Sequence, residues 1–278
     1  MTLTENGARR SAWVEAVVAL ALIVTILPIA WTVLLAFMPN RAIVDTDWQF
    51  AFWLGNFQAV FEDGVFVLQV LNSVVIVIGS VLICLVIGSL AGYALSTLHP
   101  PRWLTIPALI VTGFIPLIPP MTLVPGLYLL LADLGILGSV TGLVLVNALF
   151  NLPFATLLMS SYFGSVPGEL REAARVDGAT EWRTLWSVIL PVVKPGLAAT
   201  GIFAGILSWN EFMMGLTLTS GGRTAPVTVG IAGLLQPYAV TWGELAAAGT
   251  VAAVPIIIMA VFANRQIVSG LTGGAVKG

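Results

Sequence analysis

The chain has 278 residues, of which 58% are hydrophobic and only 9% are charged, and its mean hydropathy is +1.02. Soluble domains carry about 25% charged residues, so this composition excludes an ordinary soluble domain and indicates a protein whose main partner is the lipid bilayer. The formal net charge of −2, from 11 basic and 13 acidic residues, gives no reason to expect a nucleic-acid partner.

The sequence offers little for catalysis or metal binding. Cys84 is the only cysteine and lies in an apolar run, which excludes an intrachain disulfide and a cysteine metal site. His99 is the only histidine, which removes most histidine-based catalysis. The two lysines, Lys194 and Lys277, do not follow a glycine-rich phosphate loop, so the chain has no Walker A motif. We therefore expect no catalytic residue, no metal and no cofactor in this chain.

Six apolar stretches are each long enough to cross a bilayer, which takes about 20 residues in a helix. The first stretch is longer than the apolar region of a cleaved signal peptide, so we expect it to remain as a span. The second stretch is rich in β-branched residues, but its length favours a membrane helix over a strand. The predicted spans are residues 13–37, 67–95, 103–131, 139–163, 195–218 and 245–263.

These spans predict the domain organisation of an all-α membrane protein. A single six-span domain over residues 13–264 is expected to follow a polar segment, residues 1–12, and to precede a tail, residues 265–278. Its long connections are residues 38–66, 164–194 and 220–244. The last of these is rich in Gly, Pro and Thr, which favours turns and a flexible loop over another span.

The third predicted span contains an unusual number of prolines. Proline removes a backbone hydrogen bond from a helix and clashes with the preceding turn, so this span is expected to be kinked or partly unwound. Carbonyl groups released in this way are tolerated in a membrane only against protein or a water-filled cavity. The span can therefore line a transport pathway or be a bent helix packed on its neighbours. The prolines are Pro107, Pro116, Pro119, Pro120 and Pro125.

Lysine and arginine residues set the predicted orientation. With six spans both termini lie on one side, and nine of the 11 basic residues fall on that side. The positive-inside rule therefore predicts a multi-pass protein of the bacterial cytoplasmic membrane with both termini and segment 164–194 in the cytoplasm. The nine residues are Arg9, Arg10, Arg102, Arg171, Arg175, Arg183, Lys194, Arg265 and Lys277, and the other two are Arg41 and Arg223.

Segment 164–194 is the most polar part of the chain after its first residues, and its pattern predicts two short surface helices. Pro167 suits the first turn of a helix, and Gly178 can end that helix in the left-handed conformation. Thr180 can then cap the next helix. Four residues at helical spacing share one face of the first helix, and the small side chains among them suit the close approach of a partner. That face comprises Leu170, Ala173, Ala174 and Asp177.

The same segment contains a specific motif. Glu172-Ala173-Ala174, two further residues and Asp177-Gly178-Ala179 are followed by Leu190-Pro191. This pattern resembles the EAA signature of the membrane subunits of bacterial ABC importers. The Asp-Gly form, together with the glycine-rich chain end over residues 270–278, is similar to the carbohydrate-uptake permeases of the MalG type. The likeness covers the whole chain in length and span pattern, with one departure at Leu185, where the family usually has Phe.

The resemblance implies the type I ABC importer permease fold with a cytoplasmic coupling helix. It also implies two copies of a cytoplasmic ABC ATPase, which bind ATP and Mg²⁺ in place of this chain. A second permease subunit, an extracytoplasmic solute-binding protein and a sugar substrate complete the implied system, and the tail 265–278 adds a second ATPase contact. The implied coupling residues are Glu169, Glu172, Ala173, Ala174, Asp177, Gly178, Ala179, Leu190 and Pro191.

Polar residues within the spans are candidates for a substrate pathway. An ionisable group inside a membrane is costly, so Glu211 defaults to a functional hypothesis. Asn210 and Glu211 can hydrogen-bond sugar hydroxyls, and Trp209 or Phe212 can stack on a pyranose ring. In the alternative interpretation, Asn210 and Glu211 hold helices together or cap an unwound stretch. The same two readings are open for Asn147 and Asn151.

The external segment 220–244 has a role implied by the resemblance. In permeases of the MalG type the corresponding loop reaches into the solute-binding protein, which points to Gly221, Gly222 and Arg223. A passive connector is the alternative interpretation.

Two other function classes need features that this sequence lacks. An ion-coupled secondary transporter needs several buried ionisable residues and often shows internal repeats. An intramembrane enzyme needs paired catalytic groups within the spans, whereas Glu211 has no obvious companion.

Overall fold

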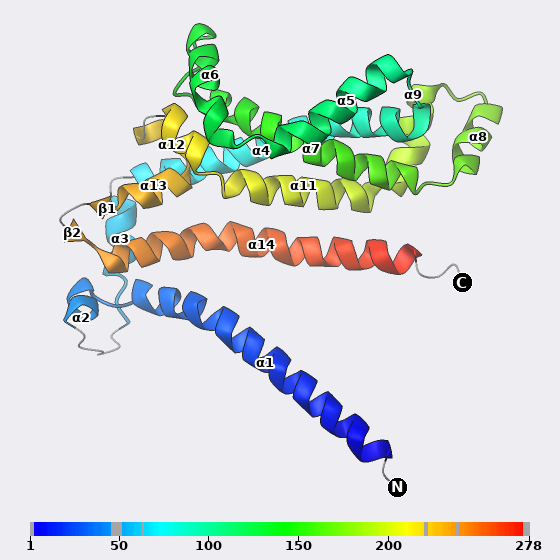
Figure 1. The fold of residues 1–278 in the computed structure, drawn as a ribbon. Coiled ribbons are helices and arrows are strands. Elements are labelled where there is room, and N and C mark those ends of the chain that lie inside the picture. Colours follow the sequence, from blue (N-terminus) through cyan, green and yellow to red (C-terminus); the bar gives the residue numbers. More distant parts are fainter. Residues whose placement is uncertain (1–2, 46–51, 63, 220–221, 237–238, 275–278) are drawn as a thin grey trace. The chain divides into compact units, whose positions relative to one another are not determined.

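A computed structural model describes residues 3–45, 52–62, 64–219, 222–236 and 239–274. The described chain is helical apart from two strands of two residues each, β1 (Leu235–Gln236) and β2 (Ala239–Val240), which pair antiparallel (Figure 1). The prediction of an all-α fold is therefore confirmed. The chain divides into two compact units, unit 1 (residues 1–64 and 233–253) and unit 2 (residues 65–232 and 254–278).

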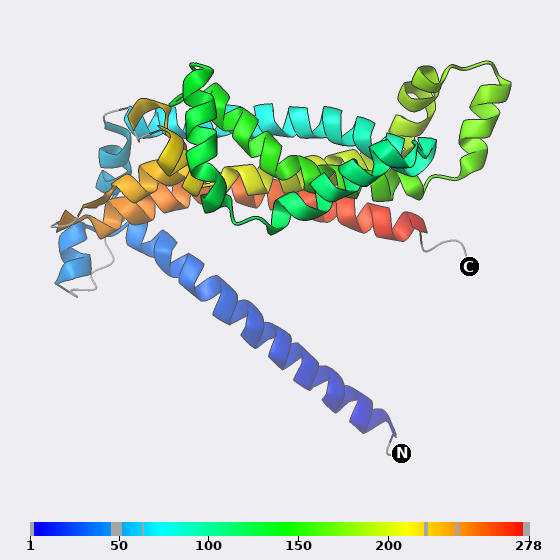
Figure 2. The same ribbon diagram turned by 45° about the horizontal axis from the view of Figure 1, so that its top comes forward.

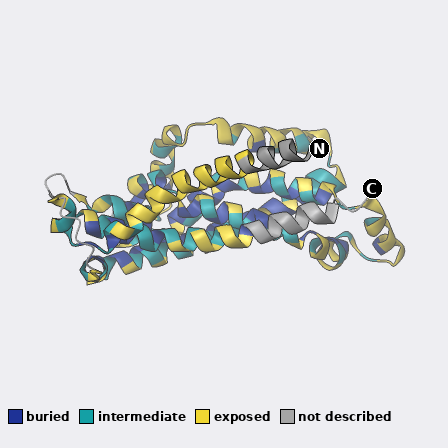
Figure 3. Cartoon of the chain, turned by 90° about the horizontal axis from the view of Figure 1, so that it is seen from below, coloured by how far each residue is buried: buried dark blue, intermediate teal, exposed yellow. Residues whose placement is uncertain are grey.

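Unit 1 contains α1 (Leu3–Ala36), α2 (Asn40–Val44) and α3 (Gly55–Glu62). The apolar stretch of α1 is almost wholly exposed along its length (Figure 3). The turn after α1 is fixed by Asn56, whose Nδ2 donates to the carbonyl of Ala36 at 2.9 Å and to that of Met38 at 2.8 Å. The predicted loop 38–66 therefore includes two short helices whose place is set by a buried amide.

The centre of unit 2 is the packing of α4 (Val65–Tyr93) against α7 (Val140–Gly164) and α11 (Lys194–Trp209). The approach of α4 to α7 requires glycine, because a Cβ on Gly92 would lie 2.7 Å from the backbone nitrogen of Ser160. Small residues at helix contacts are typical of membrane bundles, where close van der Waals packing stabilises association. Beyond Tyr93 the helix widens into a single π-turn, η1 (Ala94–Leu98).

The proline-rich third span is broken, as predicted. It consists of α5 (Arg102–Phe114), a 3₁₀ turn (Ile115–Leu117) and α6 (Pro120–Asp133), and the two α-helices meet at 110°. Pro119 is the residue before α6 and Pro120 is its first residue, and neither has the amide needed to continue the hydrogen bonds of a preceding helix. This angle is larger than the kink that the sequence predicted for a single span.

The fifth predicted span, residues 195–218, is not a single helix. α11 ends at Trp209 and α12 (Met213–Thr219) begins after a break of three residues. A 3₁₀ turn (Gly222–Thr224) and α13 (Val227–Gly233) follow, so the segment predicted to be a flexible loop is partly helical.

The sixth predicted span, residues 245–263, lies within α14 (Trp242–Gly274), which continues as a helix into the predicted tail. Tail residues 275–278 lie outside the described part of the chain. Among the described residues, four helices are long and apolar enough to cross a membrane, and up to six spans result if each of two bent helix pairs counts as one.

Candidate functional site

The motif segment folds as two short helices joined by a tight turn, as the sequence predicted. α8 (Gly168–Val176) precedes the turn, and α9 (Glu181–Thr184) continues through a π-turn, η3 (Leu185–Ile189), into α10 (Leu190–Val192). Pro167 is the residue before α8, one position earlier than expected. Figures 1 and 2 show α8 and α9 at one end of unit 2 and α12 and α13 at the other. We call residues 164–194 the coupling loop, after the role that the resemblance implies for them.

The turn of the coupling loop depends on Gly178. Its φ of +78° lies in the left-handed region, which a side chain disfavours. The amide of Gly178 donates to Arg175 O at 3.0 Å, and the amide of Ala179 donates to Ala174 O at 2.9 Å. This pair of bonds is the Schellman pattern that satisfies the last carbonyls of a helix. Thr180 then accepts the Arg183 amide at 3.3 Å and caps α9, so both predicted turn signals are confirmed.

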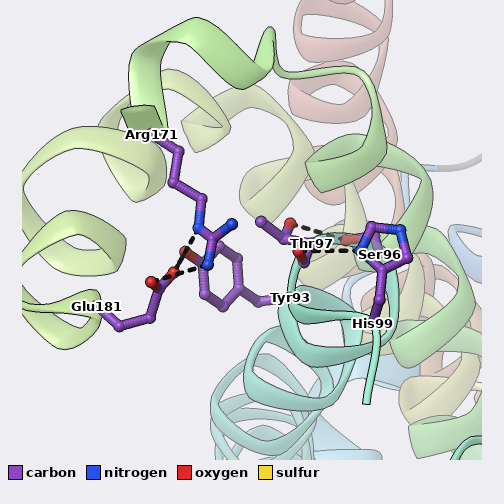
Figure 4. A network of polar contacts seen from close by, with 6 residues as sticks. All are labelled: Tyr93, Ser96, Thr97, His99, Arg171 and Glu181. Atoms are coloured by element: carbon purple, nitrogen blue, oxygen red, sulfur yellow. Dashed lines mark hydrogen bonds and ion pairs between the residues drawn. The ribbon is translucent and has the colours of Figure 1, made fainter. Parts of the chain in front are cut away.

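An ion pair joins the two helices of the coupling loop (Figure 4). Nε of Arg171 donates to Oε1 of Glu181 at 2.8 Å, and Nη2 donates to Oε2 at 2.9 Å. This two-point geometry is stronger and more specific than a single contact. The bonds from Arg171 lower the pKa of Glu181, and the same contact raises the pKa of Arg171.

Tyr93, at the end of α4, completes this arrangement by donating its hydroxyl to Oε1 of Glu181. The carboxylate of Glu181 therefore ties α8, α9 and α4 together (Figure 4). Sequence reasoning missed this contact. The opposite charges of Arg171 and Glu181, on either side of a predicted turn, are a signal that could have indicated their ion pair, but no sequence signal points to Tyr93.

Apolar packing holds the rest of the coupling loop against α4 and α7. The rings of Tyr93 and Phe163 meet edge to face with centroids 5.3 Å apart. Leu185 is 3% exposed, so it fills its site in this cluster. This cluster makes the coupling loop continuous with the core of unit 2. Its buried members are Tyr93, Met159, Phe163, Leu185, Ile189 and Val193.

The outer surface of the coupling loop carries most of the motif residues. Ala174 is buried at 7% exposure, so the predicted four-residue docking face is split, with Ala173 and Asp177 exposed and Ala174 turned inward. Ala179 and Leu190 are half-buried. The most exposed large apolar side chain is Val176, at 87%. The other exposed motif residues are Glu169, Glu172, Gly178 and Pro191.

A cavity of about 280 Å³ lies behind α8. Its lining includes Arg171 and Glu172 of α8, two residues of the π-turn η1, and His99. His99 there has a φ of 47°, and its Nδ1 lies 3.2 Å from the carbonyl of Thr97 (Figure 4). A polar turn therefore lines the same cavity as the coupling loop.

The polar residues predicted within the spans meet around a smaller cavity, of about 140 Å³. Asn147, Asn151 and Glu211 all line it, so the structure brings together residues far apart in sequence. Nδ2 of Asn151 donates to the hydroxyl of Ser208 at 2.9 Å, and Ser208 lies 2.9 Å from the hydroxyl of Ser80. Asn151 therefore joins α7 to α11 directly and to α4 through Ser208. This agrees with the interpretation that such polar residues hold helices together.

Glu211 lies in the break between α11 and α12 and caps the second helix. Its carboxylate accepts the amides of Met214 at 2.7 Å and Gly215 at 3.0 Å. An acidic cap both satisfies free amides and interacts well with the positive end of the helix. The hydroxyl of Thr228 also donates to the Glu211 carbonyl at 2.7 Å, which ties the break to α13.

The neighbours of Glu211 differ in exposure. Asn210 is exposed and donates Nδ2 to the Ile206 carbonyl at 2.8 Å, while Asn147 makes the same kind of bond to Leu143 at 2.9 Å. Trp209 is 3% exposed, so its ring has no free face in this conformation, and Phe212 is half-buried.

The segment predicted to be external is held by polar side chains at the first turns of α4. Nδ2 of Asn72 donates to the carbonyl of Arg223 at 2.7 Å and to that of Ala225 at 3.1 Å. The hydroxyl of Ser73 accepts the Val227 amide at 2.8 Å. These bonds explain why a segment predicted to be flexible adopts defined turns. Gly222 has a φ of +78° and Arg223 is exposed, whereas Gly221 lies outside the described residues.

Comparisons with known proteins agree with this arrangement. The family described as "Binding-protein-dependent transport system inner membrane component" matches residues 84–272. A trehalose transport system permease protein of Mycobacterium tuberculosis is 32% identical over 277 residues, 98% of this chain and 100% of the relative. A trehalose/maltose transport system permease protein of Thermococcus litoralis is 33% identical over 261 residues, 92% of this chain and 93% of the relative.

The fold itself matches a solved structure. A chain of a bacterial ABC transporter involved in the import of the acidic polysaccharide alginate superposes with a TM-score of 0.74 at 22% identity, covering 93% of this chain and 97% of that chain. The relatives are named as permeases, which confirms that the chain is a transport component and not an enzyme. They give no support to an ion-coupled transporter. The chain belongs to the family of binding-protein-dependent transport system inner membrane components.

Proposed function

We propose that this chain is one of two permease subunits of an ATP-driven sugar importer and that its coupling loop is the contact with a cytoplasmic ABC ATPase. The observation that carries this proposal is the construction of the coupling loop. Its inner side is fixed to α4 and α7, while Glu172, Ala173 and Asp177 remain exposed. A segment that is rigid on one side and exposed on the other suits the transmission of force to the spans.

The mechanism follows from this geometry. Two ATPase copies close when they bind ATP and Mg²⁺, and the cleft that receives α8 moves with them. Because Glu181 and the apolar cluster fix the coupling loop to α4 and α7, the spans follow the movement. The cavity between the permease subunits then opens alternately to the two sides of the membrane. In this chain, Glu172 would provide polar contacts to the ATPase and Gly178 the turn.

The proposed orientation in the membrane suggests where the remaining partners bind. With the coupling loop in the cytoplasm, the segment of Gly222 and Arg223 lies outside, where a solute-binding protein delivers substrate. The exposure of Arg223 and the fixed backbone beneath it support this contact. The inner membrane as location and both termini in the cytoplasm belong to the same proposal, with the tail as a second ATPase contact.

The substrate is proposed to be a sugar, as the names of the relatives indicate for those proteins. The cavity lined by Asn147, Asn151 and Glu211 is the proposed contribution of this chain to the pathway. Asn210 and Phe212 lie in the break between α11 and α12. Asn210 can offer the sugar a hydrogen bond, and Phe212 can offer a ring face. Trp209 would need to turn out of its buried site to take part.

Reconstitution tests the proposed function. The chain, its partner permease and the ATPase are placed in proteoliposomes, and uptake of labelled trehalose and maltose is measured with and without ATP and the solute-binding protein. Uptake should require both additions and should persist when a protonophore removes the proton gradient. Uptake that stops with the protonophore while ATP is present would contradict the proposal.

A further inference from the structure

One helix in unit 2 is bonded to both functional loops. α4 holds the external segment through Asn72 and Ser73 near its start, and it holds the coupling loop through Tyr93 at its end. Asn72 and Tyr93 are about 30 Å apart at 1.5 Å per residue, roughly the thickness of the hydrocarbon core. Both attachments are side-chain hydrogen bonds to parts of the chain remote in sequence.

α4 is suited to transmit displacement. It is a continuous helix of 29 residues without an internal proline, in contrast to the broken third and fifth spans. It is also pressed against α7, where Gly88 and Gly92 leave no space for a Cβ without a shift. The pairs Gly79-Ser80 and Gly88-Ser89 are positions where a helix can kink, but α4 runs through both as one unbroken helix. We therefore expect it to move as a body.

The outer attachment is made to backbone groups, which fixes the path of the segment. Asn72 binds two carbonyls on either side of Thr224, and Gln69 lies against Gly230 so closely that a Cβ there would overlap its amide. Nε2 of Gln69 also lies 3.4 Å from the carbonyl of Gly222. A shift of α4 along its axis would therefore carry this backbone, and the exposed Arg223 on it, in the same direction.

We propose that α4 is a direct mechanical link between the coupling loop and the external segment, with Tyr93 and Asn72 as its positioning residues. Movement of the coupling loop would pass through Glu181 and Tyr93 to α4, and from Asn72 to the surface that carries Arg223. The affinity of the complex for its solute-binding protein would then depend on whether ATP is bound. Coupling between binding sites is reciprocal, so the binding protein would change ATP affinity by the same factor.

This inference rests on the proposed function, because it assumes an ATPase at the coupling loop and a binding protein outside. It adds a route between these contacts that does not pass along the chain through α7 or α11. Glu181 already forms an ion pair with Arg171, so its further bond to the Tyr93 hydroxyl is not needed to neutralise its charge. An attachment of the coupling loop to α4 gives that bond a purpose.

The test measures the affinity of the assembled complex for the solute-binding protein in nanodiscs, without nucleotide and with ATP under conditions that prevent hydrolysis. The ratio of the two affinities is the readout, since a merely structural defect would change both values alike. Variants are Tyr93→Phe, which keeps the ring, Asn72→Leu, which keeps the approximate size, and the double variant. Tyr162→Phe removes a phenol hydroxyl beside the same apolar cluster and serves as the control.

In the unmodified complex we expect the affinities with and without ATP to differ by about tenfold or more. In either single variant this ratio should decrease by a factor of about three to ten. The double variant should show no further decrease, because both residues act on the same link. Tyr162→Phe should retain the original ratio. Ratios unchanged in both single variants, or effects that multiply in the double variant, would overturn the link. Glu181→Gln, which alters the other side of the Tyr93 contact, should reproduce Tyr93→Phe, and a full ratio in Glu181→Gln would also overturn it.

Failure of the link and failure of the proposed function give different results. If the unmodified complex takes up sugar with ATP but the variants keep its affinity ratio, only the link is wrong. If the unmodified complex shows no dependence of uptake on ATP, the proposed function itself is wrong.

Discussion

The coupling loop and the break at Glu211 are both polar interruptions of an apolar chain, but they use their charges differently. In the coupling loop one ion pair, Arg171 with Glu181, fixes the segment, and other charged residues such as Glu169 and Glu172 remain exposed. At the break, the carboxylate of Glu211 is bonded to the first free amides of α12. In apolar surroundings a polar group is expensive unless it is paired, so it is first used to complete the fold. Exposed charge on a rigid support is therefore the better guide to a partner contact.

The largest effect is expected from Gly178→Pro, which tests the rigid turn of the coupling loop. Proline fixes φ near −65°, whereas Gly178 has a φ of +78°, and it removes the amide that bonds to Arg175. ATP-dependent uptake should be lost while the protein remains in the membrane, as measured by transport and by immunoblots of membrane fractions. Gly168→Ala, where a Cβ meets nothing within 4 Å, is the control and should transport normally. Normal transport by Gly178→Pro would count against the docking role.

The next effect separates folding from substrate contact at the break. Glu211→Ala removes the cap of α12, which costs about 0.5–2 kcal/mol of stability by analogy with other helix caps. Thermal unfolding of the purified complex should shift to lower temperature, and Glu211→Gln, which keeps one acceptor oxygen, should shift less. If instead both variants unfold normally and only the KM for sugar rises, Glu211 is a substrate contact and its capping role is secondary.

A smaller effect is expected when pH weakens the ion pair of the coupling loop. The folded protein lowers the pKa of Glu181 below its unfolded value of about 4.3, so the contribution of this carboxylate to stability is complete above that value. It is lost as pH falls through the lower, folded pKa. The melting temperature of the complex, followed from pH 6 downward to roughly pH 3, should therefore fall more steeply than that of Glu181→Gln. Equal slopes would show that the pair contributes nothing.

The smallest effect concerns the split docking face. Ala173 is exposed and Ala174 is 7% exposed, although both were predicted to face the partner. Ala173→Ser should leave the unfolding temperature within about 1 °C, since exposed substitutions usually change stability by less than 0.5 kcal/mol. Ala174→Ser buries an extra hydroxyl and should lower it by a few degrees. Equal shifts would contradict the inward orientation of Ala174.

The sequence predicted the parts of the fold that local chemistry determines. The proline positions predicted the break in the third span. Gly178 and Thr180 predicted the turn and the helix cap of the coupling loop. The contacts between remote segments were not predictable. Tyr93 and Glu181 are 88 residues apart in sequence, and no pattern near residue 93 indicates that carboxylate. Residues 195–218 were predicted to be one span because they are apolar enough to cross a bilayer. The alternative interpretation of Glu211, a cap on an unwound stretch, agrees with the break that follows Trp209.

Cross-linking of the coupling loop tests the central claim most directly. The native Cys84 is buried, so a cysteine at position 173 can be addressed selectively with a bifunctional reagent in the assembled complex. We predict that Ala173→Cys cross-links to the ATPase, that the yield changes when ATP is added, and that the buried neighbour in Ala174→Cys cross-links far less. Cross-linking of Ala173→Cys to the solute-binding protein, or no ATPase product from a complex that still transports sugar, would contradict the account.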